Sequence, residues 1–162
     1  MIKSLFKNVL VVVNSSEASI QAVKYAALLS KIYHCSVKIV YVVDMATIRK
    51  LTLTKLFVQE ESEEYIARLI EDGKRYLKHT EEICAIKGVK VQTEMRKGSI
   101  CAEVIAVADE MKADMILLGA FEKPGEDPRD VISSSYRQII VKAHCSVLVV
   151  KESMIEKLFK MA

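Results

Sequence analysis

Two short apolar segments near the start of the chain, joined by an amphipathic helical segment, constrain the fold more than any other feature. Residues 8–13 and 36–43 are rich in valine with little polar alternation, which is typical of strands covered on both faces. Between them, residues 20–33 carry apolar side chains at helical spacing after the turn and cap residues 14–16. This order is a βαβ unit, so the two strands must be parallel and the crossover right-handed.

The same alternation continues toward the C-terminus. Strands are predicted over 89–95, 114–118 and 146–150, and helices over 59–87, after Gly98 and Ser99, and over 133–143. The segment 89–95 alternates polar and apolar residues, which favours an edge strand with one wetter face. The sequence therefore predicts an α/β fold, an open, doubly wound, five-stranded parallel sheet with helices on both faces.

Two segments fit this alternation less well. Residues 45–58 mix apolar side chains with arginine and lysine, and are interpreted as an extra helical turn packed on the sheet edge or, alternatively, as a lid or partner-binding flap. Residues 152–162 form an amphipathic tail with Ile155, Leu158 and Phe159 on one side. Its apolar area is small for a membrane anchor, so we expect it to dock on the domain or on a second subunit. The predicted organisation is one domain over 1–151 followed by this tail.

Composition narrows the function classes. A chain of 162 residues that is 51% hydrophobic, with five glycines and two prolines, favours one compact domain. A net charge of +3 is too small to indicate a nucleic-acid partner. The four cysteines are widely spaced and predict neither a disulfide framework nor a zinc knuckle. With no secretory signal and no membrane span predicted, we expect a cytoplasmic protein.

The predicted sheet also suggests where a ligand would bind. In an open α/β sheet, ligands bind beyond the carboxyl ends of the strands, at the point where the strand order reverses. If the first and fourth strands flank that point, the loops 14–17 and 119–135 line the crevice. The serines at 133–135 open a helix whose N–H groups would attract an anion, but they are equally well explained as helix caps.

Taken in order, these pieces resemble the universal stress protein family over nearly the full length. The matching motifs are Lys-Asn-Val-Leu-Val-Val-Val-Asn-Ser-Ser at 7–16, Val-Tyr-Val-Val-Asp at 40–44, Gly-Ser at 98–99, Ala-Asp-Met-Ile-Leu-Leu-Gly at 113–119 and His-Cys-Ser-Val-Leu-Val-Val-Lys at 144–151. The resemblance implies a Rossmann-like sheet with strand order 3-2-1-4-5. It also implies a homodimer formed through the last strand, along the apolar edge that begins at Val147 and ends at Val150.

Nucleotide-binding members of that family carry three glycines across the last loop, the third followed by Ser or Thr, and an aspartate after the first strand. In this chain Gly119 matches the first glycine, Glu122 falls at the second, Ser133 and Ser134 stand at the third glycine and the hydroxyl, and Asn14 replaces the aspartate. Each lost glycine adds a Cβ where the backbone should approach phosphate, and Glu122 adds like-charge repulsion. The nucleotide motif is therefore interpreted as degenerate.

The favoured hypothesis is a non-catalytic stress-response module with a degenerate nucleotide crevice and an unknown protein partner. The alternative is a genuine binder of ATP or AMP, with Mg²⁺. Its candidate contacts, implied by the resemblance, are Val12, Asn14, Val43, Leu118, Gly119, Ser133, Ser134 and Ser135.

Catalytic and metal-binding constellations are not predicted. The pairs His34-Cys35 and His144-Cys145 each precede a strand, which places them at the amino-terminal edge, opposite the crevice. In the implied strand order two other strands separate them, which is too far for a joint zinc or thiol–imidazole site. A hydrolase or phosphotransferase on this scaffold is the third and least favoured hypothesis.

Overall fold

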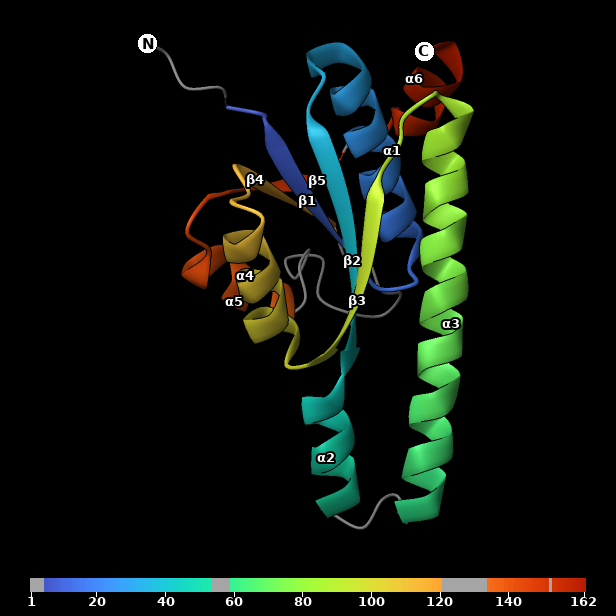
Figure 1. Ribbon diagram of the computed structural model, residues 1–162, viewed down its shortest axis with the longest axis vertical. Coiled ribbons are helices and arrows are strands. Elements are labelled where there is room, and N and C mark those ends of the chain that lie inside the picture. The colour runs from blue at the N-terminus through green and yellow to red at the C-terminus, as the bar shows by residue number, and fades with distance from the viewer. Residues whose placement is uncertain (1–4, 54–58, 121–133, 152) are drawn as a thin grey trace.

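The computed structural model describes residues 5–53, 59–120, 134–151 and 153–162. Five parallel strands form one sheet in the order β3-β2-β1-β4-β5 (Figure 1). The strands are β1 (Asn8–Val13), β2 (Ser36–Asp44), β3 (Gln92–Gly98), β4 (Met115–Gly119) and β5 (Ser146–Val150). This arrangement confirms the predicted fold class and strand order, and it places the reversal of strand order between β1 and β4.

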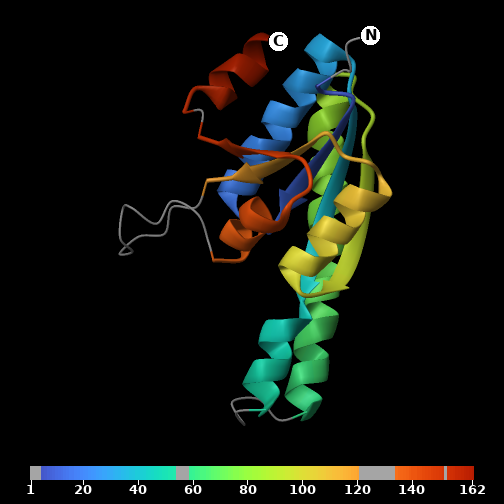
Figure 2. The same cartoon turned by 90° about the vertical axis from the view of Figure 1, so that its left-hand side faces the viewer.

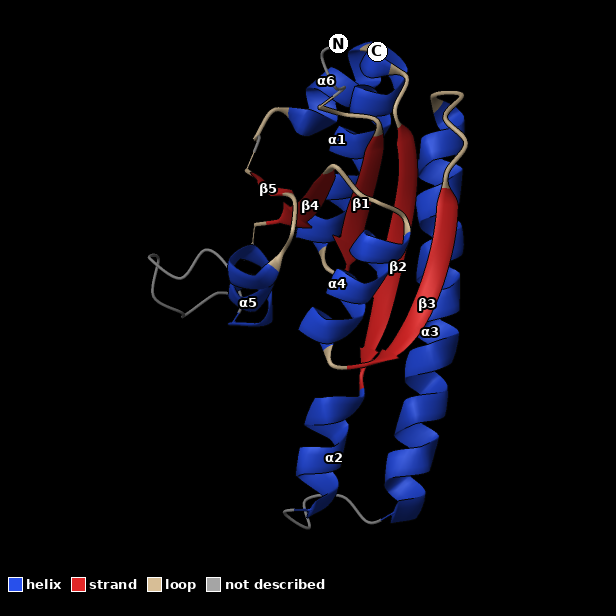
Figure 3. Cartoon of the chain, turned by 60° about the vertical axis from the view of Figure 1, so that its left-hand side comes forward, coloured by secondary structure: helices blue, strands red, loops and turns tan. Residues whose placement is uncertain are grey.

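The described helices are α1 (Glu17–Tyr33), α2 (Met45–Leu53), α3 (Gln59–Ile86), α4 (Ile100–Glu110), α5 (Ser134–Lys142) and α6 (Ile155–Met161). Four of them cover the two faces of the sheet. α1 and α3 lie on one face, and α4 and α5 lie on the other (Figure 3). Within the described ranges, none of these helices has the combination of length and apolar character that crossing a bilayer requires.

The core consists of two apolar layers, one on each side of the sheet. On β1, Val9, Val11 and Val13 belong to the layer beneath α1 and α3, whereas Leu10 and Val12 belong to the layer beneath α4 and α5. Successive side chains of a strand point to opposite faces, so a strand covered on both faces has no polar positions. This burial on both faces explains why residues 8–13 form an almost uninterrupted apolar run in the sequence.

The predicted start of the third strand, at residue 89, is wrong by three residues. Gly88 adopts φ of +71°, its N–H donates to the carbonyl oxygen of Ala85, and the N–H of Val89 donates to that of Cys84. These two bonds form a Schellman motif, so Val89 closes α3 instead of opening β3. β3 begins at Gln92 and is an edge strand of the sheet, as its alternating pattern predicted.

The segment predicted to pack on the sheet edge lies elsewhere. α2 and the N-terminal half of α3 run side by side beyond the carboxyl ends of the strands (Figures 1 and 2). We call this projection, residues 45–53 and 59–70, the arm. The helical interpretation of 45–53 is confirmed, whereas its placement over the sheet edge is wrong, because α2 follows β2 directly and continues away from the sheet.

The C-terminal tail forms α6, which packs on α1. Ile155 and Phe159 are buried, and Leu158 is 45% exposed. Lys24 pairs with Glu156, and the ammonium groups of Lys24 and Lys87 lie 5.4 and 4.9 Å from the centre of the Phe159 ring. Docking on the body of the domain, one of the two expected positions, is therefore the arrangement in this chain.

Candidate functional site

The turn between β1 and α1 forms one side of the crevice expected from the sequence. The Oδ1 atom of Asn14 accepts hydrogen bonds from the hydroxyl groups of Ser16 and Ser19, at 2.6 and 2.7 Å. Ser16 is the N-cap of α1, and its Oγ accepts a hydrogen bond from the N–H of Ser19 at 3.2 Å. The side-chain oxygen of Asn14 is thus used to hold the first turn of α1 in place.

Two tyrosines support this turn from neighbouring elements. Ser15 adopts φ of +66°, and its Oγ lies 3.0 Å from the hydroxyl of Tyr41 on β2. Tyr76 of α3 donates a hydrogen bond to the carbonyl oxygen of Ser16 at 3.0 Å. Burial raises the pKa of Tyr76, which stays a neutral donor at physiological pH.

A third tyrosine lies near the same strand ends, in the apolar layer on the opposite face of the sheet. Tyr136 of α5 is 4% exposed and belongs to the layer that contains Val12 and Leu118, each one residue before the end of its strand. Burial raises the pKa of Tyr136 to about 12. A buried side chain of the protein itself therefore lies close to the point where the strand order reverses.

Gly119 ends β4 where that strand meets the first turn of α1. A Cβ added at Gly119 would lie 2.5 Å from the carbonyl oxygen of Ala18 and 2.6 Å from its carbonyl carbon. No Cβ tolerates such distances to backbone atoms. Close packing of α1 on β4 accounts for a glycine at this position, without any phosphate group.

The remaining candidate residues differ in what they offer to a ligand. Val12, Val43 and Leu118 are buried, Val43 in the layer beneath α1 and α3 and the other two in the opposite layer, so their side chains serve the core. The side chain of Ser134 is exposed and that of Ser135 is half-buried at the start of α5. Ser133, like Glu122, lies outside the described residues.

Reasoning from the sequence missed the two tyrosines that hold the turn, Tyr41 through Ser15 and Tyr76 through Ser16. These tyrosines come from β2 and α3, so no local motif joins them to the turn. The only local signal was the serine-rich turn 14–16, which predicted the cap but not its supports.

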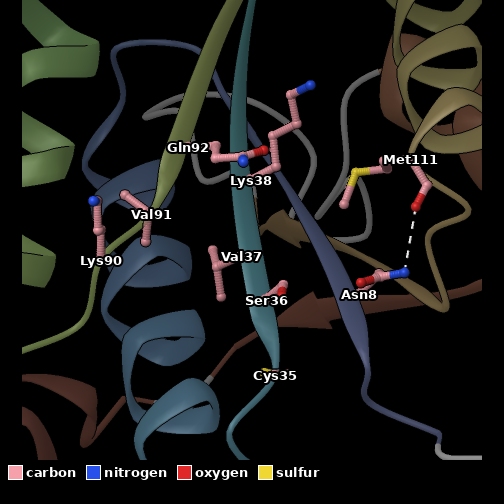
Figure 4. Close-up of a pocket in the computed structure, with 9 residues that line it drawn as sticks. All are labelled: Asn8, Cys35, Ser36, Val37, Lys38, Lys90, Val91, Gln92 and Met111. Carbon is pink, nitrogen blue, oxygen red and sulfur yellow. Dashed lines mark hydrogen bonds between the residues drawn. The ribbon is translucent and has the colours of Figure 1, made fainter.

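A second concave region lies at the opposite, amino-terminal edge of the sheet (Figure 4). It has a volume of about 470 Å³ and is lined by Asn8, Cys35, Ser36, Val37, Lys38, Lys90, Val91, Gln92 and Met111. Asn8 donates a hydrogen bond to the Met111 carbonyl oxygen at 3.3 Å, and Lys38 pairs with Glu94 at 3.2 Å. Burial raises the pKa of the Cys35 thiol, which makes it a poor nucleophile.

The two histidine–cysteine pairs lie at this amino-terminal edge, as predicted. His34 caps the C-terminus of α1, and the Nδ1 atom of His144 lies 3.0 Å from the carboxylate of Asp109. Among the residues that the structure describes, no group of three or more His, Cys, Asp or Glu side chains could hold a metal ion.

Comparison with known proteins agrees with the fold. The model of the universal stress protein family matches residues 5–151. A universal stress protein of Methanocaldococcus jannaschii is 33% identical over 151 residues, which is 93% of this chain and 85% of that protein. The structure of the universal stress protein UspA from Lactobacillus plantarum superposes with a TM-score of 0.76 at 21% identity, covering 92% of this chain and 100% of that one.

Two further structures are described as nucleotide complexes. A universal stress protein in complex with cAMP has a TM-score of 0.61 at 16% identity, covering 91% of this chain and 98% of that one. One from Archaeoglobus fulgidus in complex with dAMP has a TM-score of 0.59 at 18% identity, covering 91% of this chain and 100% of that one. These similarities concern the fold, whereas the family match spans nearly the whole sequence. This chain belongs to the universal stress protein family.

Proposed function

We propose that this protein is a non-catalytic stress-response module of the cytoplasm whose carboxyl-edge crevice binds adenine nucleotides weakly or not at all. The observation that supports this proposal is that the protein's own residues already make contacts with one another in the crevice. The side-chain oxygen of Asn14 bonds to Ser16 and Ser19, Gly119 is packed against Ala18, and Tyr136 is buried in the same layer as Val12 and Leu118, near the ends of β1 and β4. A nucleotide would have to displace these contacts and offset the free energy they supply.

A second candidate function is adenine-nucleotide binding, with ATP or AMP and Mg²⁺. Two universal stress proteins of the same fold are described as complexes with cAMP and dAMP. The exposed hydroxyl of Ser134 and the half-buried one of Ser135 at the start of α5 would be the groups available to phosphate.

Titration calorimetry with ATP and with AMP, in the presence of Mg²⁺, separates the two candidates. The proposal expects no measurable heat of binding at millimolar nucleotide. A dissociation constant near micromolar would overturn it in favour of the second candidate. Comparison of the variant Tyr136→Ala with a control variant at an exposed tyrosine, Tyr33→Ala, tests whether Tyr136 prevents nucleotide binding. A gain of nucleotide affinity in Tyr136→Ala alone would show that it does.

The absence of catalysis is tested with the same protein. Prolonged incubation with ATP and Mg²⁺ should release no phosphate above the level of a blank without protein. Release that is proportional to protein concentration would support a hydrolase and would contradict the non-catalytic proposal.

We also propose that two copies pair through β5, as the family resemblance implies. β5 is an outer strand of the sheet, and Val147, Leu148 and Val149 on it are only half-buried in one chain. An uncovered apolar edge strand favours pairing with another chain. Val149→Lys places a charge on this edge and should remove one dimerisation contact. An unchanged mass in sedimentation velocity would contradict pairing through β5.

A further inference from the structure

The arm leaves part of its apolar seam uncovered. Four large side chains on the inner side of α3 are only half-buried within the arm: Tyr65, Ile66, Leu69 and Ile70. Residues at the corresponding positions of the same helix beside the sheet, such as Leu77 and Ile83, are buried. The difference arises because the sheet covers the second half of α3, whereas α2 is the element of the described chain that lies beside the first half (Figure 2). The first half of α3 and the nine-residue α2 lie beyond the sheet, and short helical segments gain little stability without further packing.

The outer side of α2 is basic and apolar. Its exposed residues Ala46, Arg49, Lys50 and Leu53 recur at intervals of three and four, which places them on one stripe of the helix. Leu53 at the end of this stripe is 83% exposed. Such a stripe favours a partner that supplies carboxylates around an apolar contact.

The first turns of α3 carry the opposite charge. Glu61, Glu63 and Glu64 are exposed, and no ion pair of theirs is formed in the part of the chain that the structure describes. The later carboxylates Glu71 and Asp72 are paired with lysine and arginine of the same helix, at 3.9 and 2.6 Å. Three exposed carboxylates without such an ion pair therefore lie close together at the start of α3, within the arm.

We propose that the arm is an interface with a second copy of this chain, in which α2 of each copy packs along the first turns of α3 of the other. The arm carries both the basic stripe and the acidic turns, so it is complementary to itself under a two-fold axis. Two such arms together form a four-helix arrangement that covers the half-buried seam. This contact lies at the carboxyl end of the sheet and is independent of pairing through β5.

Charge reversal with rescue by mixing tests the proposal on the full-length protein. One variant carries Arg49→Glu and Lys50→Glu, so that the charges on its α2 and on the first turns of its α3 are all acidic. The other carries Glu61→Lys and Glu64→Lys, so that its arm has a net positive charge. Each variant alone should lose the arm contact, which halves the mass in sedimentation velocity. An equimolar mixture should regain the wild-type mass, because both contacts of a mixed pair join opposite charges.

Rescue by mixing distinguishes contacts between copies from charge pairs within one chain, which mixing cannot restore. Lys78→Glu and Glu82→Lys, on exposed positions of α3 beside the sheet, serve as controls and should leave the mass unchanged.

The proposal is overturned if folded arm variants keep the wild-type mass, or if the mixture stays at the mass of its components. Where reversal prevents folding, the neutral substitutions Arg49→Gln and Lys50→Gln replace it and should raise the dissociation constant at least several-fold. Repeating the series with Val149→Lys present keeps the two interfaces separate, since failure at β5 leaves the arm-dependent change of mass intact.

Discussion

At the scale of single residues, two positions of the crevice have roles in packing and capping. Gly119 matches the first glycine expected from the family resemblance, and its close neighbour in the structure is the backbone of Ala18. Asn14 stands where an aspartate is expected, and its oxygen organises the cap of α1. Both residues therefore have a structural role that persists whether or not a nucleotide binds.

Gly119→Ala should destabilise the fold even without ligand. The new Cβ would press on the Ala18 carbonyl group, and backbone atoms cannot rotate away as a side chain could. The expected loss in the free energy of unfolding is roughly 1–3 kcal/mol, the usual cost of overpacking. Urea unfolding measures it. The second substitution Ala18→Gly should fail to restore stability, since the nearest atoms are backbone. Full recovery in the double variant would contradict the clash.

Tyr136 should make stability fall at alkaline pH. Its pKa is about 12 in the folded chain and about 10 when unfolded, so between these values the unfolded state loses a proton that the folded state keeps. Stability attributable to this group is thus complete below about pH 10 and declines as the pH rises toward 12, by up to about 1.4 kcal/mol per pH unit. Urea midpoints of Tyr136→Phe measured at pH 9 and pH 11 should change less than those of the wild type. Parallel pH dependence in the two proteins would exclude this role.

At the scale of elements, the sequence predicted what local pattern determines and missed what packing determines. The strand order and both faces of β1 followed from apolar runs and resemblance. The start of β3 was misplaced because Val89 fits a strand pattern and a Schellman closure equally well. Helical spacing identified residues 45–53 as helical, but spacing cannot show what a helix packs against. The bonds of Tyr41 with Ser15 and of Tyr76 with Ser16 were missed because these residues meet only in the folded chain.

The docking of α6 should depend on Phe159. This ring is 7% exposed, and the ammonium groups of Lys24 and Lys87 lie 5.4 and 4.9 Å from its centre. Phe159→Ala removes the main apolar contact of a short terminal helix, with an expected loss of about 3 kcal/mol in that docking contact. Limited trypsin digestion should then cleave after Lys157 and Lys160 faster than in the wild type. Met161→Ala, at a position that is 74% exposed, is the control and should leave the rate unchanged. Equal cleavage rates in all three proteins would mean that Phe159 does not hold α6.

At the scale of the whole molecule, the chain divides into a body with two closed apolar layers and an arm with one open seam. Opening is easiest where few apolar contacts hold an element, so amide exchange should be slow in β1 and β4 and fast in α2 and the start of α3. If two arms pack together, that difference depends on assembly. Hydrogen exchange followed by mass spectrometry should show residues 45–53 and 61–70 exchanging at least several-fold faster in the Arg49→Glu, Lys50→Glu variant than in the wild type. Peptides from β1 and β4 should be unaffected, because both strands lie within the body.

Equal exchange of the arm in both proteins would mean that α2 and α3 hold each other without a second copy. The buried Ile48 of α2 and the half-buried side chains of α3 that pack on the same layer, such as Leu69 and Ile70, would then be sufficient packing for the arm.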